Sequence, residues 1–262
     1  MKFHIKSNRC LMTISAAALM LTVSLAAFGF APFIHAAPAD HNEPSVHKQH
    51  ATYDQDQSIL LPPQYQRALP TAEVLIDVGH GGIDGGAHHE NLLEKDINLA
   101  VSKKLYTKLR ASGIRTILNR NGDYALSDDN RWHRSHSRHQ RDLSQRSQLT
   151  KEIQTQIVVS LHVNWAADST ARGPLVLHQN EGESAFLAFC IQDTLNRGQR
   201  TRQMPRIGKP FYLLNVVKQP AVIVEMGYIS HAGDRQMLTD PREQAKIADA
   251  IASGVRNYIL LR

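Results

Sequence analysis

The stretch VLIDVGH at residues 74–80 decides the predicted fold: a short apolar run, Val74–Val78, is followed at once by Gly79 and His80. A β-branched run of this length that stops at a glycine is typical of a strand buried on both faces of a parallel sheet. In open α/β sheets, ligands gather outside the carboxyl ends of such strands. His80 therefore occupies a position where a functional side chain is expected.

Strands and helices alternate downstream of this run. The first helix carries Ile97, Val101, Leu105 and Leu109 on one i+4 row, and Gly113 ends it. Alternation of this kind predicts an α/β fold, a single domain with a twisted, mostly parallel sheet and helices on both faces. Further strands are predicted over 114–118, 157–161, 176–177 and 221–224, and helices over 94–112, 144–152, 184–196 and 241–258.

The N-terminal part of the chain differs from the rest in composition. Three basic residues in the first ten precede an almost wholly apolar or small stretch from Leu11 to Ile34. This is the layout of an export signal, so we expect residues 1–39 to be a signal peptide. The run is also close to the roughly 20 residues that span a bilayer, so an uncleaved membrane anchor stays open. Residues 40–71, rich in His, Asp, Gln and Pro, predict a flexible linker before a globular domain at 72–262.

Charge and cysteine content narrow the classes of partner. The formal net charge is +6, of which Lys2, Lys6 and Arg9 supply three, so the rest of the chain is only mildly basic. Such a surplus favours anionic polymers such as cell-wall glycans with acidic stem peptides and does not indicate nucleic acid. Cys10 lies in the predicted signal, and Cys190, in an apolar helical pattern, is interpreted as a buried hydrophobic residue.

Three predicted strands are each followed by a side chain suited to metal chemistry: His80, His162 and Glu225. A catalytic zinc site usually has three protein ligands and one open position, so the two histidines need one more donor. Glu94, at the head of the first helix, is the candidate, and Glu90 in the preceding loop is its rival. Glu225 would take a proton from the attacking water. Taken singly, Glu94 is also explained by the helix macrodipole and Glu225 by a capping role.

Other patterns carry less weight. The glycines between 79 and 86 lack the Lys-Ser/Thr ending of a P-loop and the Gly-x-Gly-x-x-Gly spacing, so nucleotide binding is not predicted. The polar segment 119–145 is predicted to be irregular and to overhang a site. Its basic side chains suit an acidic substrate or a solvated surface, and its histidines are interpreted as substrate-loop or solvated residues. They are Arg131, Arg134, Arg138, Arg141, His133, His136 and His139.

Four motifs in this order resemble a known enzyme family. They are LIDVGHGG at 75–82, LEKDIN at 93–98, SLHVN at 160–164 and VEMGY at 224–228. Together they resemble the type 3 N-acetylmuramoyl-L-alanine amidases of bacterial cell-wall metabolism, over roughly Glu73 to Tyr258. The segment with Tyr124–Asp128 and Arg141–Leu143, followed by Arg146, is most similar to the germination-specific amidases of endospore formers.

The resemblance implies a zinc amidase catalytic domain at 72–262. One zinc ion would be bound by His80, Glu94 and His162, which decides for Glu94 over Glu90, and Glu225 would be the catalytic acid/base. The implied reaction cleaves the amide between the lactyl group of N-acetylmuramic acid and the L-alanine of the stem peptide. The implied partner is peptidoglycan, and the implied locations are the cell wall or the forespore intermembrane space.

Two rival functions stand beside this one. A wall-binding or regulatory relative would keep the fold and lose turnover, although all four chemical residues are present here. A zinc peptidase would cut within the stem peptide instead. Its first histidine and glutamate are expected close together in sequence, whereas His80 and Glu94 are fourteen positions apart.

Overall fold

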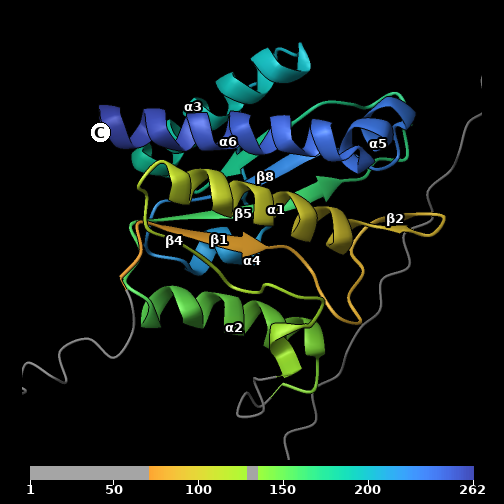
Figure 1. Ribbon diagram of the computed structural model, residues 1–262. Helices are drawn as coiled ribbons and strands as arrows, with labels where there is room; N and C mark the ends of the chain where they lie inside the picture. The colour runs from red at the N-terminus through yellow and green to blue at the C-terminus, as the bar shows by residue number, and fades with distance from the viewer. Residues whose placement is uncertain (1–70, 129–134) are drawn as a thin grey trace, which may run out of the picture. The chain divides into compact units, whose positions relative to one another are not determined.

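We describe residues 71–128 and 135–262 of a computed structural model (Figure 1). The predicted export signal and residues 40–70 of the predicted linker lie outside the described residues. Among the described helices, none is long and apolar enough to span a membrane.

A six-stranded sheet forms the centre of the domain. Its strands are β1 (Val74–Val78), β4 (Thr116–Leu118), β5 (Ile157–Asn164), β6 (Leu175–His178), β7 (Arg206–Ile207) and β8 (Ala221–Tyr228). Their order across the sheet is β4-β1-β5-β8-β6-β7. The four strands from β4 to β8 are parallel, β6 runs antiparallel to β8, and β7 pairs with β6 in parallel. The predicted mostly parallel sheet is confirmed.

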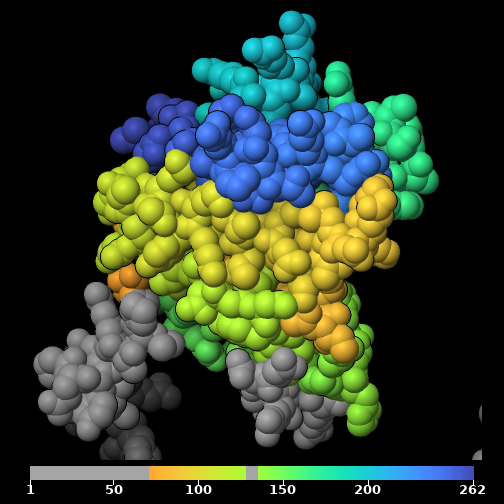
Figure 2. All heavy atoms as spheres, turned by 45° about the vertical axis from the view of Figure 1, so that its right-hand side comes forward, coloured from red at the N-terminus to blue at the C-terminus, as the bar shows by residue number. Residues whose placement is uncertain are grey.

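Helices cover both faces of this sheet. α1 (Glu94–Ala111), α3 (Gly182–Gln199) and α6 (Pro241–Leu261) pack on one face and share the larger apolar core with it. α1 and α6 adjoin on the surface, as the yellow and blue segments of Figure 2 show. α2 (Arg138–Glu152) and α4 (Tyr212–Val216) flank the other face, where the core is smaller (Figure 1). α5 (Ala232–Thr239) connects β8 to α6.

The face flanked by α2 and α4 carries polar side chains near the carboxyl ends of its strands. Because side chains alternate along a strand, Asp77 shares this face with buried Leu75, and Ser160 shares it with Val158. In the register, Asp77 lies opposite Ser160 on the neighbouring strand. One step further along, His162 of β5 lies opposite Glu225 of β8.

The segment before β5 differs from its prediction. Residues 119–145 were predicted to be irregular and a helix was predicted to begin only at 144. In the structure α2 begins six residues earlier, at Arg138. Ser137 caps it, because its side chain accepts a hydrogen bond from the backbone N–H of Gln140. Ser-x-x-Gln is a helix-start signature, and the many charged residues around it obscured that signal. The short elements β2 (His88–His89), β3 (Leu92–Leu93), η2 (Leu126–Asp128), β7, α4 and α5 were not predicted.

Candidate active site

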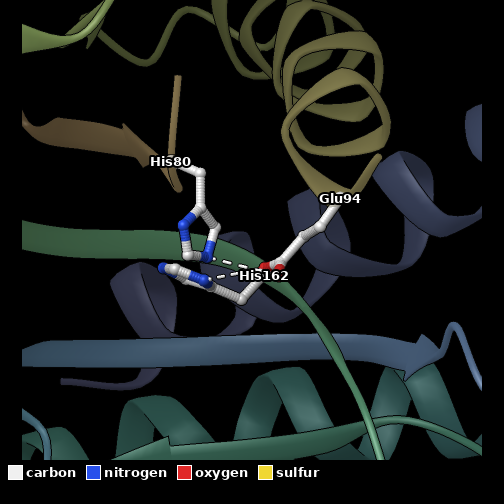
Figure 3. A group of neighbouring side chains, drawn as sticks. All are labelled: His80, Glu94 and His162. Atoms are coloured by element: carbon white, nitrogen blue, oxygen red, sulfur yellow. Dashed lines mark hydrogen bonds and ion pairs between the residues drawn. The ribbon is translucent and has the colours of Figure 1, made fainter. Parts of the chain in front are cut away.

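His80, Glu94 and His162 converge at the carboxyl end of the sheet (Figure 3). His80 follows β1, Glu94 begins α1, and His162 lies on β5. One donor atom from each residue lies within 4.8 Å of the other two. His80 Nε2 is 3.2 Å from Glu94 Oε2, and His162 Nδ1 is 3.0 Å from Glu94 Oε1. Two imidazole nitrogens and a carboxylate oxygen are a donor set that zinc accepts.

Glu94 is held from several directions. Its Oε1 accepts hydrogen bonds from the Val163 N–H and from the Asn98 amide, and its Oε2 accepts from the Ala87 N–H. Burial opposes ionisation, but the hydrogen bonds from the two histidines hold the pKa of Glu94 well below its usual range. Its rival Glu90 is exposed in the turn between β2 and β3 and does not belong to this cluster.

The backbone folds tightly around these side chains. A Cβ at Gly79 would lie 2.5 Å from His162 Cε1, and a Cβ at Gly86, where φ is +67°, would lie 2.5 Å from Glu94 Oε2. Neither position accepts a side chain without moving a member of the cluster. The glycine-rich loop is therefore explained by close approach to the histidine and carboxylate groups.

Glu225 lies beside the cluster on β8, opposite His162 in the register. Its side chain is buried, and its Oε2 has no hydrogen-bond partner among the described residues. Burial raises the pKa of Glu225 to about 7. A buried carboxyl group with a pKa near neutrality is suited to proton transfer in both directions.

His162 and Glu225 lie within their strands, and the prediction that they follow them was wrong. β5 continues to Asn164 and β8 continues to Tyr228. Only His80 follows a strand end. His162 and Glu225 instead point from the face of the sheet flanked by α2 and α4, because their positions alternate with buried apolar residues such as Leu161 and Val224.

A buried ionic layer below the cluster was not predicted. Arg146 of α2 donates to Asp77 Oδ1 at 2.7 Å and to Asp142 Oδ2 at 2.6 Å. Asp77 Oδ2 also accepts from the Ser160 hydroxyl at 2.5 Å. Asp77 lies within the first family motif, and Arg146 follows the segment that is similar to the germination-specific amidases. Their ion pair, however, joins residues 69 positions apart in the chain. No sequence spacing indicated that contact.

A cavity of about 440 Å³ opens from the cluster between α2 and α4. Glu225 lines it, as do His139 and Leu143 of α2. Its wall also contains three aromatic side chains that are 37–59% exposed, namely Trp165, Phe211 and Tyr212. Sequence reasoning missed these aromatics, which had no motif around them.

The other residues singled out from the sequence lie in different parts of the chain. His139 lies on α2 at the cavity, and His136 precedes that helix. Arg131, His133 and Arg134 lie outside the described residues. Cys190 is buried in α3, as predicted, and is a free thiol.

Comparison with known proteins decides the family. The model of the N-acetylmuramoyl-L-alanine amidase family, Amidase_3, matches residues 74–257. The chain belongs to this family.

Individual relatives agree with the assignment. The amidase is 34% identical to the uncharacterized protein YqiI of Bacillus subtilis, over 77% of this chain and 92% of YqiI. It is 31% identical to the germination-specific N-acetylmuramoyl-L-alanine amidase of the same organism, over 71% of this chain and 78% of that protein. The solved CwlD amidase of Clostridioides difficile, in complex with the GerS lipoprotein, superposes with a TM-score of 0.69 at 30% identity. That match covers 73% of this chain and 100% of the solved CwlD chain.

The predicted α/β fold and the predicted family are both confirmed. The protein is an N-acetylmuramoyl-L-alanine amidase, an enzyme whose scissile amide lies in peptidoglycan. The activity that the family supports is cleavage at the muramoyl–L-alanine bond, and not cleavage within the stem peptide.

Proposed function

We propose that the amidase works with one zinc ion held by His80, Glu94 and His162. The observation that supports this most directly is the convergence of their donor atoms within 4.8 Å. The site fits the metal chemically, because both oxygens of one carboxylate already face the two imidazole rings. When bound, zinc would polarise the scissile carbonyl and stabilise negative charge on its oxygen.

Glu225 is the proposed acid/base. Its carboxylate takes the proton from the attacking water and then delivers it to the departing nitrogen of L-alanine. Its free Oε2 supports this role, because a carboxylate oxygen fully engaged by the protein would have no capacity to accept a proton from water. Burial keeps the carboxyl group out of bulk solvent and brings its pKa close to the pH at which proton exchange is efficient.

The cavity between α2 and α4 is proposed to hold the substrate around the scissile amide. Partly exposed aromatic side chains are a frequent means of binding, because they bury a large area at low cost in conformational entropy. Trp165, Phe211 and Tyr212 line this cavity and are proposed to contact the muramoyl-peptide.

The finer biological role is proposed to be muramic lactam formation in spore cortex. Similarity to a germination-specific amidase over 78% of that protein's length supports it. The corresponding location is outside the cytoplasmic membrane, in the cell wall or the forespore intermembrane space, reached through the export signal predicted at 1–39. CwlD was solved with the GerS lipoprotein, so a protein partner is a further proposal for this amidase.

Metal analysis of single variants tests the proposed site. Purified wild-type protein should contain about one equivalent of zinc, as a single catalytic site requires. His80→Ala, Glu94→Ala and His162→Ala should each lose most of that zinc together with activity. His178→Ala, at the end of β6 outside the cluster, serves as the control and should retain both. Full zinc content in His162→Ala would contradict the proposed ligand set.

Substrate comparison tests the biological role. The amidase should cleave purified spore peptidoglycan, and disruption of its gene should remove muramic lactam from the cortex of mature spores. Cortex with unchanged muramic lactam content would overturn the cortex role while leaving the amidase activity intact.

A further inference from the structure

Asp84 contacts the side of His80 that faces away from Glu94. Its Oδ2 lies 2.8 Å from His80 Nδ1, whereas His80 Nε2 faces Glu94. The imidazole ring is therefore held between two carboxylates, one at each nitrogen. Asp84 was not among the residues singled out from the sequence, and it has no place in the proposed zinc ligand set.

The loop that carries Asp84 fixes the position of its carboxylate. Gly81 and Asp84 exchange two backbone hydrogen bonds, at 2.9 and 3.1 Å, which closes a tight turn directly after His80. Asp84 Oδ1 accepts from the Gly86 N–H at 3.1 Å, which leaves Oδ2 directed at the histidine. This carboxylate is thus ordered by the backbone and not only by its contact with His80.

The backbone of His80 is fixed separately. Arg120 donates to the carbonyls of Val78 and Gly79, and Arg146 donates to the carbonyls of Val78 and His80. These two buried guanidinium groups hold a residue whose φ is +59°, in the left-handed region that side chains rarely adopt. The hydrogen bonds from both arginines end on backbone carbonyls, whereas the imidazole ring is paired with Asp84 and Glu94. These arginine bonds fix the backbone, and the ring is oriented by its own partners.

We propose that Asp84 is a positioning residue for metal binding. It accepts a hydrogen bond from Nδ1–H of His80, which fixes the ring orientation and the tautomer, and it thereby reserves the lone pair of Nε2 for the metal. Carboxylates that orient metal-binding histidines in this way typically contribute 10–100-fold to metal affinity. This inference rests on the proposed zinc site.

The test measures zinc affinity by competition with a chromophoric chelator, in the full-length protein as purified. Asp84→Ala should weaken zinc binding about 10–100-fold. Asp84→Asn should retain most of the affinity, because its amide oxygen can still accept from Nδ1–H. In ¹⁵N NMR of the zinc-loaded protein, the wild-type His80 Nδ1–H signal should exchange slowly with solvent. In Asp84→Ala it should exchange fast.

Asp123 provides a matched control. It supports the same loop, because it accepts from the Gly82 N–H at 2.8 Å and pairs with Lys95 at 2.7 Å, but it does not contact His80. Asp123→Asn should leave zinc affinity unchanged. Equal zinc affinity in wild type and Asp84→Ala would overturn the inference, as would an equal loss in Asp123→Asn. Failure of the wild-type protein to bind zinc would instead count against the proposed metal site itself.

Discussion

At the scale of single residues, Gly79 shows how closely the backbone approaches the site. Its absent side chain leaves room for the ring of His162, whose Cε1 would lie 2.5 Å from an added Cβ. The carbonyl oxygen of Leu161 would lie 2.6 Å away. The Leu161 carbonyl lies in a central strand and has little freedom to move. An added methyl group at Gly79 would therefore displace the backbone around it and the His162 ring.

Gly79→Ala should therefore weaken zinc binding by roughly tenfold or more, comparable to disturbing the support of a metal ligand. Gly182→Ala is the matched control, since nothing lies within 4 Å of a Cβ at that position. Chelator competition gives the affinities, and circular dichroism checks that both variants fold. Wild-type affinity in Gly79→Ala would show that His162 does not need this space.

The buried Glu225 carboxyl group should make the free energy of unfolding depend on pH. Its folded pKa, about 7, is above the ordinary value of 4.5, so the folded state retains the proton longer than the unfolded state. Its contribution to stability is therefore present at low pH and is lost as pH rises from about 4.5 through 7. At about 1.4 kcal/mol for each pKa unit, the loss is about 3 kcal/mol in the metal-free protein.

Glu225→Gln should remove this loss, because the amide does not ionise. Metal-free Glu225→Gln should gain stability relative to wild type between pH 5 and pH 8 in urea unfolding, and the zinc-loaded variant should be inactive with its zinc retained. A constant stability difference between the two proteins across this range would contradict the buried, shifted carboxyl group.

The residues that the sequence identified were those with distinctive chemistry. His80 and His162 were found because a histidine next to a buried apolar run is a natural zinc ligand. Glu94 was the first candidate for the third ligand from its place at the head of the helix, and the family resemblance settled the choice over Glu90. Asp84, Arg120 and the Asp77–Arg146 pair were not identified as partners of the site. Their roles depend on contacts between segments far apart in the chain. Such contacts arise only when the chain folds and leave no local pattern in the sequence.

At the scale of elements, α2 is attached to β1 by a buried ion pair. Arg146 and Asp77 are each only 4% exposed in their side chains. Burial opposes ionisation, but Arg146 and the Ser160 hydroxyl keep the pKa of Asp77 below its usual range. The stabilisation is therefore present above about pH 4 and is lost as pH falls through the folded pKa of Asp77.

Asp77→Ala should lower the free energy of unfolding by about 3–5 kcal/mol, because it leaves Arg146 buried without this partner. The exposed pair Arg197–Asp193 provides a control on α3, and Asp193→Ala should cost less than about 1 kcal/mol. Urea unfolding near pH 7 measures both. A loss of less than 1 kcal/mol in Asp77→Ala would show that α2 is held mainly by other contacts.

The wall formed by α4 leads to a prediction about substrate binding. Phe211 and Tyr212 are exposed by 37% and 44% at the cavity. Truncation of an aromatic residue costs more than about 1 kcal/mol of binding where that residue is one of the few that carry most of the binding energy. The double variant Phe211→Ala/Tyr212→Ala should raise KM by roughly tenfold with little change in kcat. Phe189→Ala is the control, because Phe189 is 53% exposed on α3 and does not line the cavity. An unchanged KM would exclude this wall from substrate binding.

The elements were predictable where periodicity was strong and were missed where it was weak. β1 and the amphipathic helices α1, α3 and α6 were recognised close to their observed bounds, whereas β5 and β8 were recognised from their first residues but continue three and four residues beyond their predicted ends. The first six residues of α2 were missed because its exposed face is charged and its buried face carries Asp142 and Arg146. The five-residue α4 is too short to show a period.

At the scale of the whole molecule, the sheet brings three distant segments to one edge, and α2 and α4 leave a cavity above it. The fold follows from the alternation of strands and helices, and the family follows from four motifs in order. The domain boundaries at 39/40 and 71/72 stay predictions, as does the export signal.

The site is proposed to hydrolyse the lactyl–L-alanine amide with His80, Glu94 and His162 as zinc ligands. Digestion of purified peptidoglycan, followed by mass spectrometry of the new ends, tests both the bond cleaved and the ligand set. We predict a free lactyl carboxyl group on muramic acid and a free L-alanine amine, absent after chelation and in His162→Ala, and restored to the chelated wild type by zinc. New ends within the stem peptide, or unchanged cleavage by His162→Ala, would contradict this proposal.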